Sequence, residues 1–311
     1  MNKSDNWQKE VLKTAANIRK RVMEHTIENN GGYLSQACSS GEVLATLYKK
    51  IMKLGKSTAP MIPAPFSGVP SSTNKNYLRG GAYNGPTFPE YDRFYLSPAH
   101  YALVLYVTLI EVGRMSPEGL IQFNQNGSTV EMIGAEHSPG FDMMGGNLAQ
   151  TISMSAGIVL SKKLKKEQSR VWVFMSDGEF QEGQTWEAMQ SLAHYKLDNL
   201  AIFVDVNAQQ CDGEIKNVMN IDPLHKRLEA FGARVITVNA HNPVEIEAAS
   251  VYQADGKPLV VLCESNPCHG IDLLEKRRPK LHYVRFLKEE EREEYRQYYN
   301  DKMQETGKEK V

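Results

Sequence analysis

The chain of 311 residues is long enough to bury a large hydrophobic core, in one large domain or two small ones. Its 36 basic and 37 acidic side chains leave almost no net charge, which argues against a general nucleic-acid or membrane surface but not against a local anion site. The amino-terminal residues lack an apolar signal core and no window is apolar enough to span a bilayer, so we expect a cytoplasmic protein.

The first 170 residues are predicted to be mostly helical. Amphipathic patterns cover residues 5–27, 40–54 and 98–113, and the small and apolar residues of 147–164 predict a buried helix. Between the second and third patterns, residues 55–92 are rich in Pro, Gly, Ser and Asn. Because this stretch is too long for an ordinary connection, we expect a functional loop, an interface segment or partial disorder.

The second half of the chain alternates short apolar runs with helical patterns. The apolar runs suit strands buried on both faces, because they are rich in Val, Ile and Phe. These runs are residues 170–175, 199–206, 234–238 and 258–263. The helical patterns are residues 182–195, 221–231 and 243–254. This alternation predicts the α/β class, with a doubly wound, mostly parallel sheet flanked by helices.

We expect one domain over residues 1–285, including the long loop at 55–92, followed by a charged helical tail at 286–311 that extends outward. The four cysteines form no Cys-x-x-Cys pair, which favours buried thiols over a zinc site or a disulfide framework. They are Cys38, Cys211, Cys263 and Cys268.

One apolar run ends abruptly in Ser-Asp-Gly, with a carboxylate, Asp177, at the tip of a buried strand. A buried and unpaired carboxylate costs several kcal/mol unless something compensates its charge. Asn207 follows 30 residues later, at the end of the next predicted strand. Ligands bind at this edge of parallel sheets, and oxygens from the two side chains plus a backbone carbonyl form half a shell for Mg²⁺. Phosphate oxygens and water usually complete such a shell.

Two other interpretations apply to these residues. A calcium loop fails because its sixth position is Gln210 rather than Gly and its twelfth is Lys216 rather than Glu. Asp177 could instead cap the following helix, and for the Asp-Gly pair taken alone this plainer interpretation is the better one.

The wider sequence changes that weighting, because residues 176–213, "SDGEFQEGQTWEAMQSLAHYKLDNLAIFVDVNAQQCDG", closely resemble the thiamine-pyrophosphate motif of transketolases. That motif begins Gly-Asp-Gly and ends near thirty residues later in Asn. Three further segments resemble the same family: "DRFYLSPAHYALVLYVTLIEVG" (92–113), "PGFDMMGGNLAQTISMSAGIVLSKKL" (139–164) and "FGARVITVNAHN" (231–242). The resemblance implies the thiamine-diphosphate-binding fold.

The resemblance covers only the amino-terminal third to half of a full transketolase, the domain that binds the pyrophosphate. The family's second domain binds the aminopyrimidine ring, and split members carry the two parts on separate chains. We therefore expect the amino-terminal subunit of a split transketolase, active only with a carboxyl-terminal, pyrimidine-domain subunit and sugar substrates. The implied assembly is a dimer of heterodimers, a heterotetramer.

The implied cofactors are thiamine diphosphate and Mg²⁺ or another divalent cation. By resemblance, Asp177 and Asn207 bind the metal through their side chains, and Gln209 binds it through its backbone carbonyl. Gly178 lets the backbone approach the diphosphate, because a side chain would obstruct it. His100 contacts the pyrophosphate; alone, it would be explained better as a capping or core histidine.

Gly146, Asn147 and Leu148 match the turn that meets the aminopyrimidine, although Asn147 could also cap a helix. Glu182 matches a family glutamate at the subunit interface, and as a first-turn acid it also suits a helix dipole.

The sugar end of the site carries the remaining catalytic candidates. His282 matches a late family histidine that transfers protons, a role that suits an imidazole, and His269 competes for that role. A solvated loop histidine explains either equally well. His137 matches another substrate histidine. Tyr33 occupies the place of the first substrate histidine, and a phenol donates a hydrogen bond but is no base near pH 7.

Three further departures from the family pattern surround the cofactor: Ser176, Ala149 and Thr151 each replace a glycine. With Tyr33 they leave the metal site intact and alter the sugar end. We expect transfer of a two-carbon ketol unit from a ketose to an aldose, with a modified, branched or sulfonated sugar. The alternatives are a subunit of a 2-oxo acid decarboxylating dehydrogenase, or a non-catalytic cofactor-binding subunit.

Overall fold

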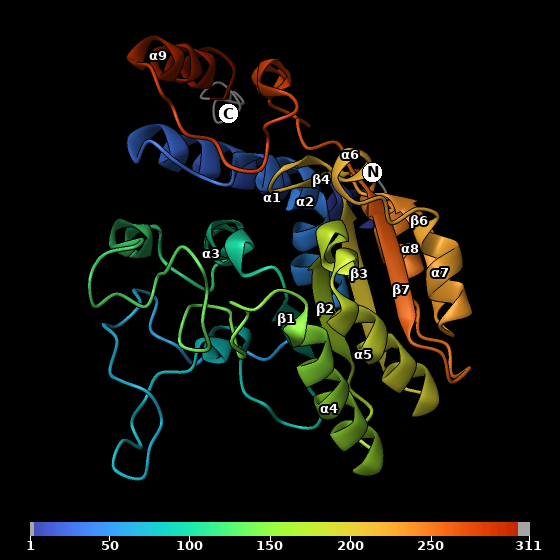
Figure 1. Ribbon diagram of the computed structural model, residues 1–311. Coiled ribbons are helices and arrows are strands. Elements are labelled where there is room, and N and C mark those ends of the chain that lie inside the picture. The colour runs from blue at the N-terminus through green and yellow to red at the C-terminus, as the bar shows by residue number, and fades with distance from the viewer. Residues whose placement is uncertain (1–2, 304–311) are drawn as a thin grey trace.

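The computed structural model describes residues 3–303, which form a five-stranded sheet with helices on both faces (Figure 1). The strand order is β1-β2-β3-β7-β6, and every neighbouring pair is parallel. The strands are β1 (Arg93–Leu96), β2 (Val171–Ser176), β3 (Leu200–Val206), β6 (Arg234–Asn239) and β7 (Leu259–Glu264). The prediction of a mostly parallel α/β sheet is confirmed, as are its four strands; the short strand β1 was missed.

Alternate strand residues enter two separate cores, one on each face of the sheet. Trp172 and Phe203 belong to the first core, whereas Val173 and Ile202 belong to the second. The first core packs under α1 (Lys3–Glu28), α2 (Leu34–Thr46), α3 (Ala102–Glu111) and α8 (Pro243–Ala249). The second packs under α4 (Gln150–Leu164), α5 (Gly183–His194) and α7 (Leu224–Ala230).

Short elements complete the described chain. The tight 3-10 turns are η2 (Gly80–Asn84), η3 (Ala99–Tyr101), η4 (Pro117–Gln122), η5 (Asp177–Gln181) and η6 (Asp272–Arg277). The π-helical turns η1 (Leu47–Ile51) and η7 (Tyr299–Met303) follow α2 and α9 (Glu289–Tyr298). A small antiparallel pair, β4 (Gln209–Gln210) and β5 (Gly213–Glu214), precedes the single turn α6 (Ile215–Val218).

Helix α2 differs from the amphipathic pattern predicted for residues 40–54. It begins at Leu34, and every residue through Thr46 is buried between α1 and the sheet. Two of its hydroxyls are satisfied within the helix: Ser40 and Thr46 each donate to a backbone carbonyl four residues earlier at 2.6 Å. Such side chains imitate a solvent-facing stripe in the sequence, which explains the error.

Two other helices also differ from prediction. Helix α3 was expected to be amphipathic, but residues 102–110 are all buried. Helix α4 was expected to be buried, but only one face is: Ile152 and Val159 pack inward, whereas Leu164 is 75% exposed.

Residues 52–92 are largely irregular, which agrees with the loop expected at 55–92. The expectation of a mostly helical first half is wrong for residues 112–149, which are also largely irregular. These two segments lie side by side beyond β1 (Figure 1). Backbone and side-chain hydrogen bonds hold them together, including Gly80 N to the Glu136 carbonyl (2.8 Å) and Thr129 Oγ1 to the Ala64 carbonyl (3.0 Å). The long loop is thus one half of a paired irregular layer.

The predicted tail does not extend outward over its described part. Helix α9 packs on α1, with Arg292 Nε donating to the Ile27 carbonyl at 2.7 Å and Tyr295 buried against Phe286. Residues 304–311 of that prediction lie outside the described residues. No described helix is long and apolar enough to cross a membrane. All four cysteines are free, but Cys211 is exposed rather than buried.

Candidate active site

The central part of the site lies where β2 and β3 end. Ser176 is paired with Asp205 in the parallel register, so Asp177 and Asn207 follow next to each other at the carboxyl edge of the sheet. Asp177 Oδ2 accepts a hydrogen bond from Ala208 N at 2.7 Å, which links the two strand ends directly. The sequence prediction that these residues share one edge therefore agrees with the geometry.

Asp177 is a buried carboxylate without a cationic partner. It is 1% exposed, and within residues 3–303 it forms no ion pair with Lys, Arg or His. Its acceptors are filled only by the backbone N–H groups of Gly178 (2.9 Å) and Ala208. Burial, together with the nearby Asp205 carboxylate, raises the pKa of Asp177 well above its usual value. A divalent cation at this edge would supply the missing charge.

Asp205 fixes the orientation of the Asn207 amide. This carboxylate is fully buried and accepts from the hydroxyls of Ser39 (2.5 Å), Tyr101 (2.8 Å) and Ser265 (2.6 Å). Asn207 Nδ2 donates both to Asp205 Oδ2 (3.0 Å) and to Tyr101 Oη (3.1 Å). With the nitrogen held on that side, the Asn207 oxygen must face the opposite direction, as a metal ligand requires.

The turn after β3 places the third predicted ligand, Gln209. Ala208 adopts a left-handed conformation (φ 58°), which is uncommon for a residue with a side chain. Gln209 N donates to Asn207 Oδ1 at 2.8 Å, and the Gln209 Oε1 atom is buried without a hydrogen-bond partner among the described residues. Strain and an unsatisfied oxygen in one turn are typical of a site that binds a ligand.

A cavity of about 250 Å³ opens above this edge. Six residues predicted from the sequence line it: His100, Leu148, Gly178, Asn207, Gln209 and His282. Glu182, the predicted interface glutamate, also lines it at the exposed rim. Gly146 and Asn147 directly precede Leu148 in an exposed turn before α4. Asn147 is not the cap of that helix, because α4 begins at Gln150 with Ala149 in the capping position.

Two predicted glycines, Gly178 in the cavity lining and Gly146 in the turn before Leu148, are not required by the protein's own packing. A Cβ added at Gly146 would meet nothing within 4 Å, and one at Gly178 would make only an ordinary 3.6 Å contact with Gln210. Neither glycine has a positive φ. The space left open fits a ligand that approaches the backbone closely, which is what a diphosphate and its ring would need.

Three aromatic candidates from distant parts of the sequence lie together beside the cavity. The His100 ring centroid is 4.9 Å from that of His282, and the Tyr33 ring lies 5.3 Å and 5.5 Å from the two histidines. Burial, and then the neighbouring His282, lowers the pKa of His100 to about 3. Burial also lowers the pKa of His282 and raises that of Tyr33, so neutral rings are favoured throughout the cluster.

Two residues of α2 that sequence reasoning missed hold His282 in place. Ser35 Oγ donates to the Leu281 carbonyl at 2.8 Å, and Gln36 Nε2 donates to the His282 carbonyl at 3.0 Å. Both residues also line the cavity. The signal was available, because both residues follow closely after Tyr33, which was already a candidate.

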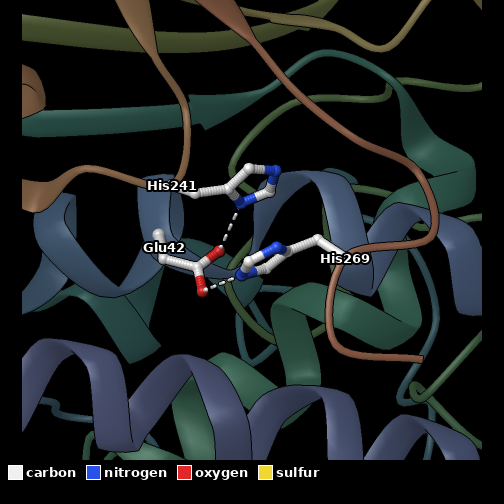
Figure 2. Close-up of side chains that lie close together, drawn as sticks. All are labelled: Glu42, His241 and His269. Carbon is white, nitrogen blue, oxygen red and sulfur yellow. Dashed lines mark hydrogen bonds and ion pairs between the residues drawn. The ribbon is translucent and has the colours of Figure 1, made fainter. Parts of the chain in front are cut away.

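His269, the competitor of His282, lies in a different cluster, with Glu42 and His241 (Figure 2). Its ring stacks on His241 at 3.8 Å, and its Nε2 lies 3.7 Å from Glu42 Oε1. These three residues could hold a metal ion by distance alone. However, Arg19 already pairs with Glu42 at 2.7 Å, and His241 Nε2 accepts from Asn266 N at 3.0 Å. The cluster is therefore satisfied without a metal.

His137 lies away from the aromatic cluster, in the irregular layer beyond β1. Its Nε2 is 3.1 Å from Glu131 Oε2, and its ring contacts Phe66 at 4.6 Å. It does not line the cavity above Asp177.

Glu179 is a buried residue that sequence reasoning also missed. Its carboxylate accepts from Ser176 N (2.8 Å), Ala149 N (3.2 Å) and the Ser97 hydroxyl, so it ties the ends of β1 and β2 to the turn before α4. Burial raises its pKa to about 7. Its position directly after Asp177 and Gly178 was the sequence feature that could have indicated it.

Comparison with known proteins agrees with this geometry. Residues 35–300 match the family "Transketolase, thiamine diphosphate binding domain". The chain is 35% identical to a transketolase family protein of Sinorhizobium fredii over 87% of this chain and 88% of that protein. It is 29% identical to the 6-deoxy-6-sulfo-D-fructose transketolase subunit SqwG of a Clostridium species, over 79% of this chain and 80% of that one.

Among solved structures, a transketolase from Campylobacter jejuni superposes with a TM-score of 0.75 at 22% identity. That match covers 97% of this chain but 44% of the solved one, so the chain spans less than half of that transketolase. The fold, the family match and the full-length relative together show that this chain belongs to the transketolase family.

Proposed function

We propose that this chain is the amino-terminal subunit of a two-chain transketolase that moves a two-carbon ketol unit from a ketose to an aldose. A relative supports the subunit assignment, since this chain aligns with 80% of a protein that is itself named a transketolase subunit. Family membership favours this function over a 2-oxo acid dehydrogenase. The partner would be a carboxyl-terminal chain with the pyrimidine domain, assembled as a dimer of heterodimers.

The observation that carries the proposal is the uncompensated Asp177 carboxylate beside the oriented Asn207 amide. These oxygens and the Gln209 backbone carbonyl would hold Mg²⁺, and Gly178 would leave room for the diphosphate of thiamine diphosphate. When bound, that cofactor supplies an electron sink for the carbon–carbon cleavage.

The aromatic cluster would perform the proton transfers at the sugar. Burial holds His100 and His282 neutral. With its pKa lowered to about 3, His100 suits hydrogen bonding better than proton uptake, which leaves His282 as the better candidate for proton transfer. The Tyr33 phenol stays protonated and can only orient a sugar oxygen as a donor. His137 would need to move to take part, because it lies outside the cavity.

Tyr33, in place of a histidine, supports a donor or acceptor other than the ordinary pentose phosphates. We infer a modified, branched or sulfonated sugar, and a relative named for a sulfonated fructose shows that the family includes such enzymes.

The test is reconstitution with the carboxyl-terminal, pyrimidine-domain transketolase chain that is proposed as the partner. The complex, supplied with thiamine diphosphate and Mg²⁺, should transfer the two-carbon unit, and neither chain alone should do so. Turnover of xylulose 5-phosphate should be slow relative to that of a modified ketose. Rapid turnover of xylulose 5-phosphate would contradict the modified-sugar proposal but not the transketolase proposal. A complex that binds the cofactor but transfers nothing would instead identify a non-catalytic binding subunit.

A further inference from the structure

The turn that precedes α4 has little regular support of its own. Residues 142–149 belong to no helix or strand, and Gly146, Asn147 and Leu148 are exposed. Within the described chain, Ala149 alone among these residues donates a backbone hydrogen bond, and the acceptor is Glu179 Oε1 at 3.2 Å. A carboxylate is therefore the main polar anchor where this turn meets α4.

Glu179 joins that turn to the ends of two strands. Its Oε1 also accepts from the hydroxyl of Ser97, the residue after β1. Its Oε2 accepts from the backbone N–H (2.8 Å) and the hydroxyl (3.2 Å) of Ser176, the last residue of β2. Glu179 is fully buried, and these four donors match the four lone pairs of a carboxylate. Such a network fixes the relative positions of the segments that it joins.

The conformation of Ala149 shows that this anchor is needed. Its backbone is left-handed (φ 66°), which is uncommon for a residue with a side chain. A strained conformation of this kind persists only where the surrounding contacts impose it. The hydrogen bond from Ala149 N to Glu179 is such a contact.

Glu179 reaches the cofactor cavity only through its neighbours, because it does not line the cavity itself. Leu148, directly before Ala149, lines the cavity, and so does Gly178, directly before Glu179. The 3-10 turn η5 carries both Asp177 and Glu179. One short turn thus holds the proposed metal ligand and the anchor of the turn before α4.

We propose that Glu179 is a positioning residue: it sets the place of the Leu148 turn relative to Asp177, and so the place of the cofactor ring relative to its diphosphate. This inference rests on the proposed function and deepens it. Glu179 contacts neither the metal nor the sugar in this arrangement, and its effect on the cofactor passes through Ala149 and Leu148.

A glutamine at this position cannot replace the carboxylate, because each carboxylate oxygen accepts one backbone N–H. The amide of Glu179→Gln has a single oxygen, and its NH2 group would face the other N–H. Ser176 is only three residues away and forms a capping box with Glu179. We therefore expect the amide oxygen to remain with Ser176 and Ala149 N to lose its acceptor.

The test compares two ligands in the reconstituted complex, each supplied with Mg²⁺. Thiamine diphosphate would contact both Asp177 and the Leu148 turn, whereas inorganic pyrophosphate would contact only the Asp177 edge. In calorimetric titrations, Glu179→Gln should weaken the binding of thiamine diphosphate by about tenfold and that of pyrophosphate by less than about twofold.

The matched control is Asp92→Asn. Asp92 is also a buried carboxylate, and it accepts from Lys53 N (2.9 Å), Arg170 N (2.8 Å) and Trp172 Nε1 (2.9 Å). It thus joins β1 and β2 at their amino ends, away from the cavity. Asp92→Asn should lower the melting temperature as Glu179→Gln does, but it should leave the affinity ratio of the two ligands unchanged.

Hydrogen exchange on the chain alone tests the anchor without a ligand. In the wild type, the Ala149 amide should be protected at least about tenfold more than the amides of Asn147 and Leu148, and Glu179→Gln should remove this difference. The wild-type measurement decides the matter even if Glu179→Gln does not fold. Equal protection of the three wild-type amides would overturn the positioning role.

The binding results separate this inference from the proposed function. Equal weakening of both ligands by Glu179→Gln, or a changed affinity ratio in Asp92→Asn, would reduce Glu179 to a structural residue and overturn the inference. If the ligand selectivity is as expected but the complex transfers no ketol unit, the positioning role stands and the transketolase proposal fails. A wild-type complex that binds neither ligand would overturn both.

Discussion

Two buried carboxylates in this chain have opposite surroundings. Glu42 on α2 is fully buried, yet Arg19 and His241 pair with it at 2.7 Å and 3.1 Å. Asp177 is equally buried but accepts only backbone N–H groups and lies near a second carboxylate, Asp205. The same chemical group is therefore internally neutralised in one region and left uncompensated in the other.

The pKa values follow this difference. Burial acts to raise the pKa of Glu42, but His241 and Arg19 outweigh it and lower the value to about 2. At Asp177, burial and the charge of Asp205 both raise the pKa. A buried charge with its own partners contributes to the fold, whereas one without them fits a site completed by an external cation.

The largest expected loss of stability follows from removing a partner of the buried Glu42 carboxylate. Arg19→Met would leave the Glu42 carboxylate buried with His241 and His269 as its remaining partners. We expect a loss of about 3–5 kcal/mol in the free energy of unfolding, measured by urea denaturation. The control, Arg21→Met, removes a less buried pair with Glu111 and should cost about 1 kcal/mol or less. Equal losses in the two variants would contradict the distinction.

The pH dependence of Glu42 sharpens the comparison. Its folded pKa of about 2 lies below its ordinary 4.5, so its stabilising contribution is fully present above pH 4.5 and is lost as pH falls toward 2. The difference in stability between the wild type and Glu42→Gln should shrink by about 3 kcal/mol across that window. Unfolding measured in urea at steps of pH tests this, and a constant difference would count against the pairing.

Substitution of Asp177, which has no charged partner, should have little effect on the stability of the metal-free protein. Without metal, Asp177→Asn should change stability by no more than about 1 kcal/mol, because the substitution removes a buried charge that had no partner. The same variant should lose the rise in melting temperature produced by Mg²⁺ with thiamine diphosphate. Asp212→Asn, an exposed acid near the cavity, should keep it. A strongly destabilised metal-free Asp177→Asn would show that the carboxylate serves the fold.

The smallest expected effect concerns the half-exposed member of the Glu42 cluster. His269 lies 3.7 Å from the carboxylate with its side chain 41% exposed, so His269→Ala should cost less than about 1 kcal/mol. His241→Ala should cost more, because His241 is mostly buried and joins Glu42 to Asn266 N. Melting by calorimetry measures both losses. If His269→Ala lowered the stability more than His241→Ala, the exposed His269 would be the more important partner of Glu42.

Much of the sheet could be predicted because its strands are continuous apolar runs, as in residues 200–206, where burial on both faces leaves a strong local signal. Strand β1 has only four residues, and helix α2 carries hydroxyls that bond within the helix, so local patterns were misleading there. These errors arise where tertiary packing overrides a short pattern.

Some features of the candidate site could likewise be predicted from the sequence, and others could not. The proximity of Asp177 and Asn207 follows from strand order alone, so it was predictable. The supporting contacts of Asp205 and Glu179, and the separation of His269 from His282, depend on loops that return from distant parts of the chain. No local spacing encodes them.

The bridge between Gly32 and Val284 also sets an order of events during synthesis. Residues near the beginning of the described chain pair with partners about 250 positions later, so the contact that brings Tyr33 and His282 together forms only after the last strand, β7, has been made. A ribosome-bound chain can therefore complete the sheet, with Asp177 and Asn207 at its edge, before Tyr33 and His282 are brought together.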